Sequence, residues 1–180
     1  SISNNAFANC EYLTTFTING KDVALSNSVL ANCRSLESVT VPYIGTAAWI
    51  TDTYMGDEYL SYANNAFANL FSYNYPSDMY SEDDTFRDSP RYYGVDTGGS
   101  GTYYVPTSLT TVDVTNAQAI PYSAFNGILA SSITVNYDKD ADLTASERTS
   151  IGAYAFYDCA NLTSFTIDSQ IETIGSYAFA

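Results

Sequence analysis

The residues with the chemistry of a metal site are three aspartates at alternate positions, Asp138, Asp140 and Asp142. This spacing follows the first half of an EF-hand calcium loop, in which alternate carboxylates share one ion. The later positions depart from that loop, because Leu143 stands where a glycine is needed and Thr149 where a bidentate glutamate is needed. We therefore expect a solvated acidic loop, with calcium binding as the alternative, and assign no metal or other cofactor.

Catalytic chemistry is restricted by the absence of histidine from the chain. Without histidine there is no Ser-His-Asp or Cys-His nucleophile system and no general base of the usual kind near neutral pH. Nine acidic residues between positions 43 and 104 keep glycan hydrolysis by paired carboxylates as a remote alternative. The run Glu82-Asp83-Asp84 is more typical of a solvated turn. We predict no catalytic residues and no enzymatic activity.

Charge and hydropathy exclude two classes of partner. The net charge is -14, and a polyanionic protein repels phosphate backbones, so we expect no nucleic acid as a partner. The apolar runs are far too short to span a bilayer, so we expect no membrane span in this segment. Hydrophobic residues make up 46% of the chain, which is enough to bury a sizeable core.

The sequence repeats itself every 23 residues. The clearest copy covers residues 151–167 in the pattern Ile-Gly-x-x-Ala-Phe-x-x-Cys-x-x-Leu-x-x-Phe-x-Ile, and residues 174–179 begin the next copy 23 positions later. The same offsets recur from Ile2 and, 23 residues further on, from Leu25. Self-similarity at such a period is typical of solenoids, in which each repeat forms one coil.

Two more copies open at Tyr62 and Ile120, and insertions interrupt the pattern at about residues 43–61, 71–106 and 136–150. The Leu-x-x-Phe-x-Ile part of each copy alternates apolar and polar residues, as expected for a short strand with one buried face. We predict a single β-rich solenoid over residues 1–180, with about five 23-residue coils and loop insertions. Because the chain starts and stops inside a repeat, we expect it to be truncated at both ends from a longer array.

Most copies have an Ala-Phe pair, which places a small residue beside a large one and suits tight packing of coil on coil. We expect the large residues to stack into an internal spine of Phe7, Leu30, Phe67, Phe125, Phe156 and Phe179. Two positions after each spine residue the chain has Asn, Gly or Asp, the residue types that best tolerate a positive φ. The predicted left-handed turns are therefore at Asn9, Asn32, Asn69, Gly127 and Asp158.

The cysteines share one position of the repeat. Cys10, Cys33 and Cys159 stand where other copies have Leu70 and Ile128, so this position favours a buried apolar group of small or medium size. We expect free, buried thiols. The alternative is a Cys10–Cys33 disulfide, because equivalent positions of neighbouring coils lie ~5 Å apart.

The motif of residues 151–167 resembles the BspA-like, or Treponema-type, leucine-rich repeat. The resemblance covers the chain outside its insertions and implies a leucine-rich-repeat-type right-handed superhelix. It also implies a secreted or cell-surface protein of a bacterium or a parasitic protist, and some members of the family adhere to host matrix proteins or to other microbes. It implies no catalytic residues, and the insertions depart from the family pattern.

One candidate binding surface is the outward face of the predicted strands, which would form the concave face that solenoids often use for binding. It would present mainly hydroxyl groups, from Thr17, Thr40, Asp113, Thr134 and Thr166. The structural alternative is that these are solvent-exposed residues of high β-propensity.

The second candidate is the segment between residues 43 and 104, which holds 11 of the 17 tyrosines and the single tryptophan. Tyrosine offers a rigid contact area with a polar tip, which recognition loops favour. We expect the presented rings to be Tyr73, Tyr75, Tyr80, Tyr92 and Tyr93. The structural alternative is that the rings pack on the edge of the solenoid.

These features predict an extracellular or cell-surface interaction module that adheres to a protein or glycan of a host or neighbouring microbe. The alternative is a purely structural segment that spaces other domains of a surface protein. The tyrosine-rich insertion favours the first hypothesis, and the uniform hydroxyl face favours the second. A carbohydrate-active enzyme is the remote alternative.

Overall fold

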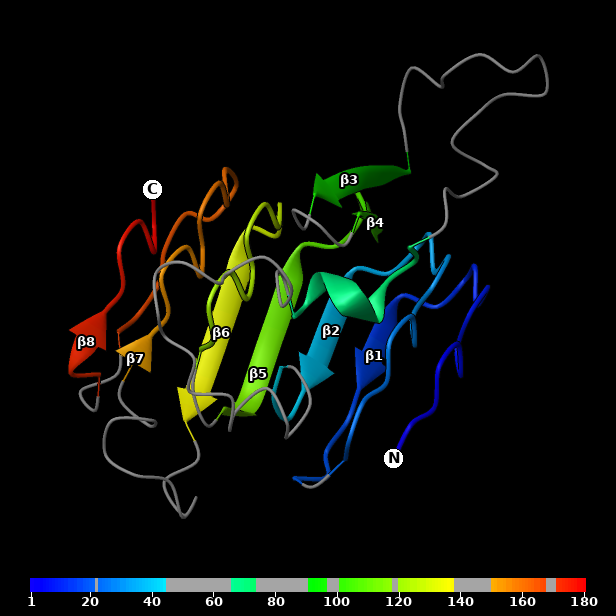
Figure 1. The fold of residues 1–180 in the computed structure, drawn as a ribbon. Coiled ribbons are helices and arrows are strands. Elements are labelled where there is room, and N and C mark those ends of the chain that lie inside the picture. The colour runs from blue at the N-terminus through cyan, green and yellow to red at the C-terminus, as the bar shows by residue number, and fades with distance from the viewer. Residues whose placement is uncertain are drawn as a thin grey trace.

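The computed structural model describes residues 1–21, 23–44, 66–73, 91–96, 101–117, 120–137, 150–167 and 171–180. The chain winds as a β-solenoid of about four turns, and the two termini lie at opposite ends of the stack (Figure 1). In the described part, helix is limited to the 3₁₀ turn η1 (Ala68–Leu70). The predicted β-rich solenoid is therefore confirmed.

One parallel sheet runs along the stack. It contains four strands in the order β1-β2-β5-β6, each from a different coil. Their bounds are Thr15–Thr17, Ser38–Val41, Thr111–Ala117 and Ser132–Tyr137. Phe16, Val39, Val112 and Ile133 are register partners across these strands, and all four are buried. The alternating sequence thus places one apolar row on the core side.

A fifth strand, expected from the Leu-x-x-Phe-x-Ile motif of the fifth coil, does not form. Residues 161–167 are described, and none of them belongs to a strand. The fourth coil reaches Ile133 one residue sooner after Phe125 than the fifth coil reaches Phe165 after Phe156. Phe165 nevertheless faces the core, where its ring contacts Phe156 and Phe179, so this segment keeps the inward face of the motif without strand pairing.

A second, narrower column of parallel pairs joins the beginnings of the coils. Ile2 pairs with Leu25, and Ile120 pairs with Ile151. The strands β7 (Ser150–Ile151) and β8 (Thr173–Ile174) continue the same column. These pairs explain why the repeats that open at Ile2, Leu25, Ile120, Ile151 and Ile174 begin on an aliphatic residue.

The turn around each spine residue is bonded to the next coil through alternate amides. In the fourth coil, Ser123, Phe125 and Gly127 donate backbone N–H groups to carbonyls of the fifth coil at 3.0, 2.7 and 2.8 Å. Tyr154, Phe156 and Asp158 donate in the same way to the segment that follows, at 3.0, 2.7 and 2.9 Å. This ladder fixes the distance between coils on the side away from the main sheet.

Left-handed residues shape this turn, as predicted, at four of the five positions. The φ values of Asn9, Asn32, Gly127 and Asp158 are 62°, 58°, 71° and 55°. A second left-handed position, two residues before the spine residue, was not predicted. It is occupied by Asn5, Ser28, Ser123, Tyr154 and Tyr177.

The prediction for Asn69 was wrong. Asn69 lies inside η1 and does not have a positive φ. Its carbonyl accepts a hydrogen bond from the Ser28 amide at 2.7 Å. In a regular coil the equivalent amide, that of Ser123, donates instead to Ala153, which lies before the spine residue Phe156. After η1 the chain continues into the long insertion instead of turning directly into a strand, so the left-handed turn is not needed there.

The spine forms as expected. Phe67 and Phe125 have ring centroids 5.4 Å apart, and Phe125 and Phe156 are stacked at 5.1 Å. Phe156 and Phe179 are stacked at 5.0 Å with an interplanar angle of 6°. The spine residues inside the stack are almost fully buried, whereas Phe7 and Phe179 at its two ends are 38% and 42% exposed.

The Ile-Gly step of the repeat also has a steric cause. A Cβ atom added at Gly152 would collide with the backbone of Pro121 and Tyr122 in the preceding coil. A Cβ at Gly175 would collide with the backbone of Gly152 and Ala153 in the same way. Glycine is required at these two positions because one backbone lies directly against the next.

The described part of the long insertion is an antiparallel hairpin of β3 (Tyr92–Asp96) and β4 (Thr102–Pro106). It lies beyond the end of the sheet at which β5 begins (Figure 1), and β4 leads directly into β5. Val95 and Val105 of the hairpin are buried in the common core. The hairpin is therefore an integral part of the solenoid edge.

Removal of a spine ring tests this core. Phe156→Ala should destabilise folding by ~3–5 kcal/mol, because it opens a cavity among the rings of Phe125, Phe165 and Phe179. Tyr12→Ala, at a ring that is 87% exposed, should change stability by less than ~0.5 kcal/mol. Chemical denaturation of both variants measures the difference, and equal losses would contradict the assignment of the core.

Candidate interaction surfaces

The outward face of the main sheet carries the predicted ladder of polar side chains over four strands. Thr17, Thr40, Asp113 and Thr134 are register partners from β1 to β6. A parallel row consists of Thr15, Ser38, Thr111 and Ser132. Neighbouring hydroxyl groups are thus separated by one strand spacing, ~4.8 Å.

Thr166 is not part of this ladder, contrary to the prediction. Its side chain is exposed, but residues 161–167 do not pair as a strand. Among the ladder residues, Thr17 and Thr134 are exposed, and Thr40 and Asp113 are half-buried. The face offers hydrogen-bonding groups and one carboxylate, without an exposed ring.

The tyrosines of the long insertion divide into anchoring and presented rings. Tyr92 is only 1% exposed, so the prediction that it is presented to solvent was wrong. The error has a simple source, because the tyrosine-rich composition of the segment does not distinguish buried rings from presented ones. Tyr93 is half-buried, and its hydroxyl accepts a hydrogen bond of 2.9 Å from the Leu129 amide of the fourth coil.

Tyr73 is the presented ring among the described residues of this set, with 54% of its surface exposed. It packs edge-to-face on Tyr103 of β4, with ring centroids 5.6 Å apart. Its ring also lies where a Cβ atom on Gly101 would stand, so glycine at that position makes room for it. Burial raises the pKa of the Tyr103 hydroxyl. Tyr75 and Tyr80 lie outside the described residues.

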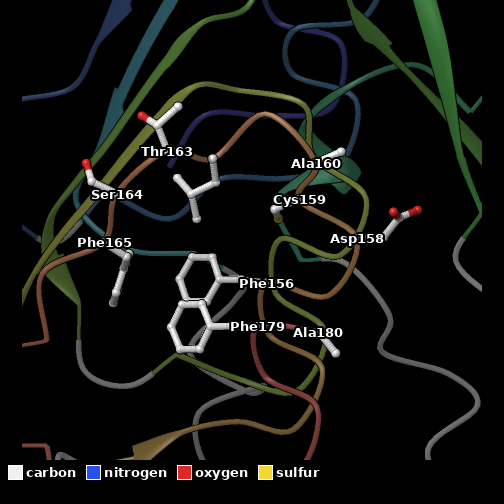
Figure 2. Close-up of a pocket in the computed structure, with 10 residues that line it drawn as sticks. Phe156, Asp158, Cys159, Ala160, Thr163, Ser164, Phe165, Phe179 and Ala180 are labelled. Atoms are coloured by element: carbon white, nitrogen blue, oxygen red, sulfur yellow. The ribbon is translucent and has the colours of Figure 1, made fainter.

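A pocket of about 500 Å³ lies at the C-terminal end of the spine (Figure 2). Stacked rings of Phe156 and Phe179 form one wall, and Phe165 lies beside them. Cys159 and Leu162 complete the apolar lining. In inner coils the equivalent residues, such as Cys33 and Leu36, are fully buried. The pocket is therefore the open end of the described repeat core, and its polar lining residues are Asp158, Thr163 and Ser164.

The cysteines are free thiols, as expected, and the alternative Cys10–Cys33 disulfide is not formed. Cys33 is buried and donates to the carbonyl of Phe7 in the preceding coil at 3.2 Å. Cys159 donates to the equivalent carbonyl of Phe125 at 3.1 Å. Burial raises the pKa of the Cys33 thiol to about 11 and that of Cys159 to about 12. Both thiols are thus protonated at neutral pH, which makes them poor nucleophiles.

We searched the described part of the chain for metal sites and for membrane-spanning helices. No group of three or more His, Cys, Asp or Glu side chains gathers there into a possible metal site. The aspartates at positions 138, 140 and 142 lie outside the described residues. No helix among the described residues is long and apolar enough to cross a membrane.

Comparison with known families agrees with this geometry. The family model of the BspA type leucine-rich repeat region matches residues 1–79 and 96–180 in 6 copies. The chain belongs to the BspA-type leucine-rich repeat family. No curated protein and no solved structure matches the chain. The BspA-type repeat accounts for the coils, whereas residues 80–95, in the middle of the long insertion, lie outside the match.

One group of side chains in the BspA-type coils was missed by sequence reasoning. Tyr122, Tyr154, Tyr157 and Tyr177, called here the tyrosine row, form a continuous set of ring contacts over the last coils. A signal was present, because Tyr154 and Tyr177 lie at one repeat position where earlier copies have Asn5 and Ser28. An aromatic residue in place of a small polar one is visible in the aligned repeats.

The thiols give a pH-dependent test of the BspA-type core. Burial raises the folded pKa of Cys33 and Cys159 above the ordinary value of 9.0. The neutral thiol therefore contributes stability that is fully present below pH about 9 and is lost as pH rises towards about 11 and 12.

Alkylation should accordingly be slow at Cys33 and Cys159 in the folded protein near neutral pH and fast in denaturant, as peptide mass mapping would show. A Cys33→Val variant should lose less stability on alkaline titration than the parent. Rapid alkylation of Cys33 in the folded state would contradict the buried, protonated thiol.

Proposed function

We propose that this chain is an interaction module of a secreted or cell-surface protein, which adheres to a protein or glycan of a host or neighbouring microbe. The observation that carries the proposal is the long insertion of the repeat, whose hairpin is anchored in the core and holds Tyr73 at the surface against Tyr103. Membership of the BspA-type repeat family supports an interaction role and a surface location.

The anchoring favours recognition because it reduces the entropy lost on binding. Tyr92 and Val105 are buried, and the Tyr93 hydroxyl is bonded to the backbone of the next coil. Tyr73 is held by Tyr103 and by the backbone at Gly101. A ring that is already positioned loses little freedom when a ligand packs on it.

The alternative proposal is a structural spacer, which the ladder of hydroxyl groups favours. Residues of high β-propensity at Thr17, Thr40 and Thr134 maintain the sheet without providing a distinctive contact surface. Enzymatic hydrolysis of a glycan stays the remote alternative. Glycan hydrolysis would require a pair of carboxylates, and the ladder contains one carboxylate, that of Asp113.

Two variants test the role of the insertion. Tyr73→Ser removes the presented ring, and replacement of residues 74–90 by a short Gly-Ser linker removes Tyr75 and Tyr80 but keeps the hairpin. The parent should bind one or more members of a panel of matrix proteins and glycans, and Tyr73→Ser should weaken that binding by about tenfold or more, as for a central aromatic contact. Surface plasmon resonance and a glycan array provide the measurements.

Tyr12→Ser is the matched control, because Tyr12 is an exposed ring far from the insertion in sequence and should leave binding unchanged. Unchanged binding by both insertion variants would show that the insertion is only a covering. Absence of binding to every member of the panel would favour the spacer.

A further inference from the structure

The tyrosine row is the most extended group of surface rings on the described coils. Tyr154 lies at its centre, with ring centroids 5.7 Å from Tyr122, 5.3 Å from Tyr157 and 5.2 Å from Tyr177. Tyr177 is 63% exposed and Tyr157 is 39% exposed, whereas Tyr122 and Tyr154 are half-buried. Two outer rings are therefore open to solvent and are supported from below by the others.

Two rings of the row occupy backbone positions that disfavour them. Tyr154 and Tyr177 have φ values of 57° and 55°, in the left-handed region that a bulky L-residue avoids. The equivalent position of the first coil is occupied by Asn5, which tolerates this conformation. Strain of this kind persists where the side chain has a use that offsets it. The Tyr177 ring is 63% exposed and adds little to the core, so its use lies at the surface, whereas the half-buried Tyr154 supports it.

Charge restricts what can bind there. The described residues 120–137, 150–167 and 171–180 contain two acidic residues, Asp158 and Glu172, both exposed, and no lysine or arginine. Lys139 and Arg148 lie outside the described residues. The whole chain has a net charge of -14. An aromatic surface in such a field repels anions and attracts cations.

We infer that the tyrosine row is a docking surface for a basic, arginine-bearing segment of a partner protein. A guanidinium group is planar, is less strongly hydrated than an ammonium group, and stacks on aromatic faces. Tyr177 and Tyr157 supply the contact rings, and Tyr154 is a positioning residue that holds both. This inference rests on the proposed interaction function and names the chemistry of one partner.

The test compares an arginine homopeptide with a lysine homopeptide of equal length, because the two carry the same charge and differ in stacking. The variant is Tyr154→Asn combined with Tyr177→Asn, which leaves the net charge unchanged and introduces the residue of the first coil. Asparagine tolerates the left-handed backbone, so the variant should melt at the same temperature as the parent or higher. Tyr157→Ser, at a position of ordinary backbone, is the second variant, and Tyr12→Asn is the control.

The parent should bind the arginine peptide more tightly than the lysine peptide in calorimetry. The double variant removes the Tyr177 ring and the Tyr154 support of Tyr157. It should therefore lose about 5- to 30-fold in affinity for arginine, the effect of two exposed cation–π contacts, and should keep its affinity for lysine. Tyr157→Ser should show a smaller loss in the same direction. Tyr12→Asn should match the parent.

Equal affinity of the parent for both peptides, unaltered in the variants, would overturn the inference, since binding would then be due to charge alone. A neutral glycan that binds the parent and not the double variant would overturn it in favour of a sugar ligand. The double variant retains Tyr73 and the insertion, and Tyr73→Ser retains the tyrosine row. Failure here is thus distinguishable from failure of the proposed adhesion at the insertion.

Discussion

The structure depends on one constraint, which is that each coil must lie one hydrogen-bond spacing from the next on two sides at once. On one side the parallel strands impose ~4.8 Å. On the other side alternate amides of the spine turn, such as Phe125 and Phe156, bond to carbonyls of the following coil at 2.7 Å. The repeated small residues follow from this spacing, since a Cβ atom at Gly152 or Gly175 would enter the neighbouring backbone. The spine follows as well, because rings held ~5 Å apart can stack.

The constant spacing between coils also explains why the same position of the repeat can hold a thiol or an aliphatic group. Cys33 and Cys159 each reach the spine carbonyl of the preceding coil at 3.2 and 3.1 Å, so the thiol fills the gap and satisfies an acceptor. Leu70 and Ile128 fill the same position by packing alone. Burial keeps such a thiol in its neutral, protonated form. It therefore behaves as a small apolar group with a weak hydrogen-bond donor.

Periodicity made most of the coil predictable from sequence. Most exceptions are residues whose surroundings differ from those of their equivalents in other repeats. The spine, the strand register and the left-handed turns at Asn9, Asn32, Gly127 and Asp158 all depend on contacts with an equivalent residue one repeat away. At Asn69 the chain enters an insertion, so its surroundings differ from those of its equivalents although its residue type is the same. Tyr92 was assigned to the surface from composition, which does not distinguish buried rings from presented ones, and it is 1% exposed. The fifth coil has the complete strand motif, yet residues 161–167 do not pair as a strand, so the motif alone does not specify strand pairing.

At positions fixed by the coil spacing, the residue type cannot vary to suit a ligand, because a change there alters the distance between backbones. The residue type can vary where the coil spacing does not restrict the side chain, namely in the insertions and at turn residues that point away from the core. Tyr73 lies in the first class and Tyr177 in the second, and both are exposed rings supported by another tyrosine. In Tyr177 the side chain even opposes the local backbone preference. A residue that the fold tolerates at a cost and the core does not use is better explained by an external contact than by stability.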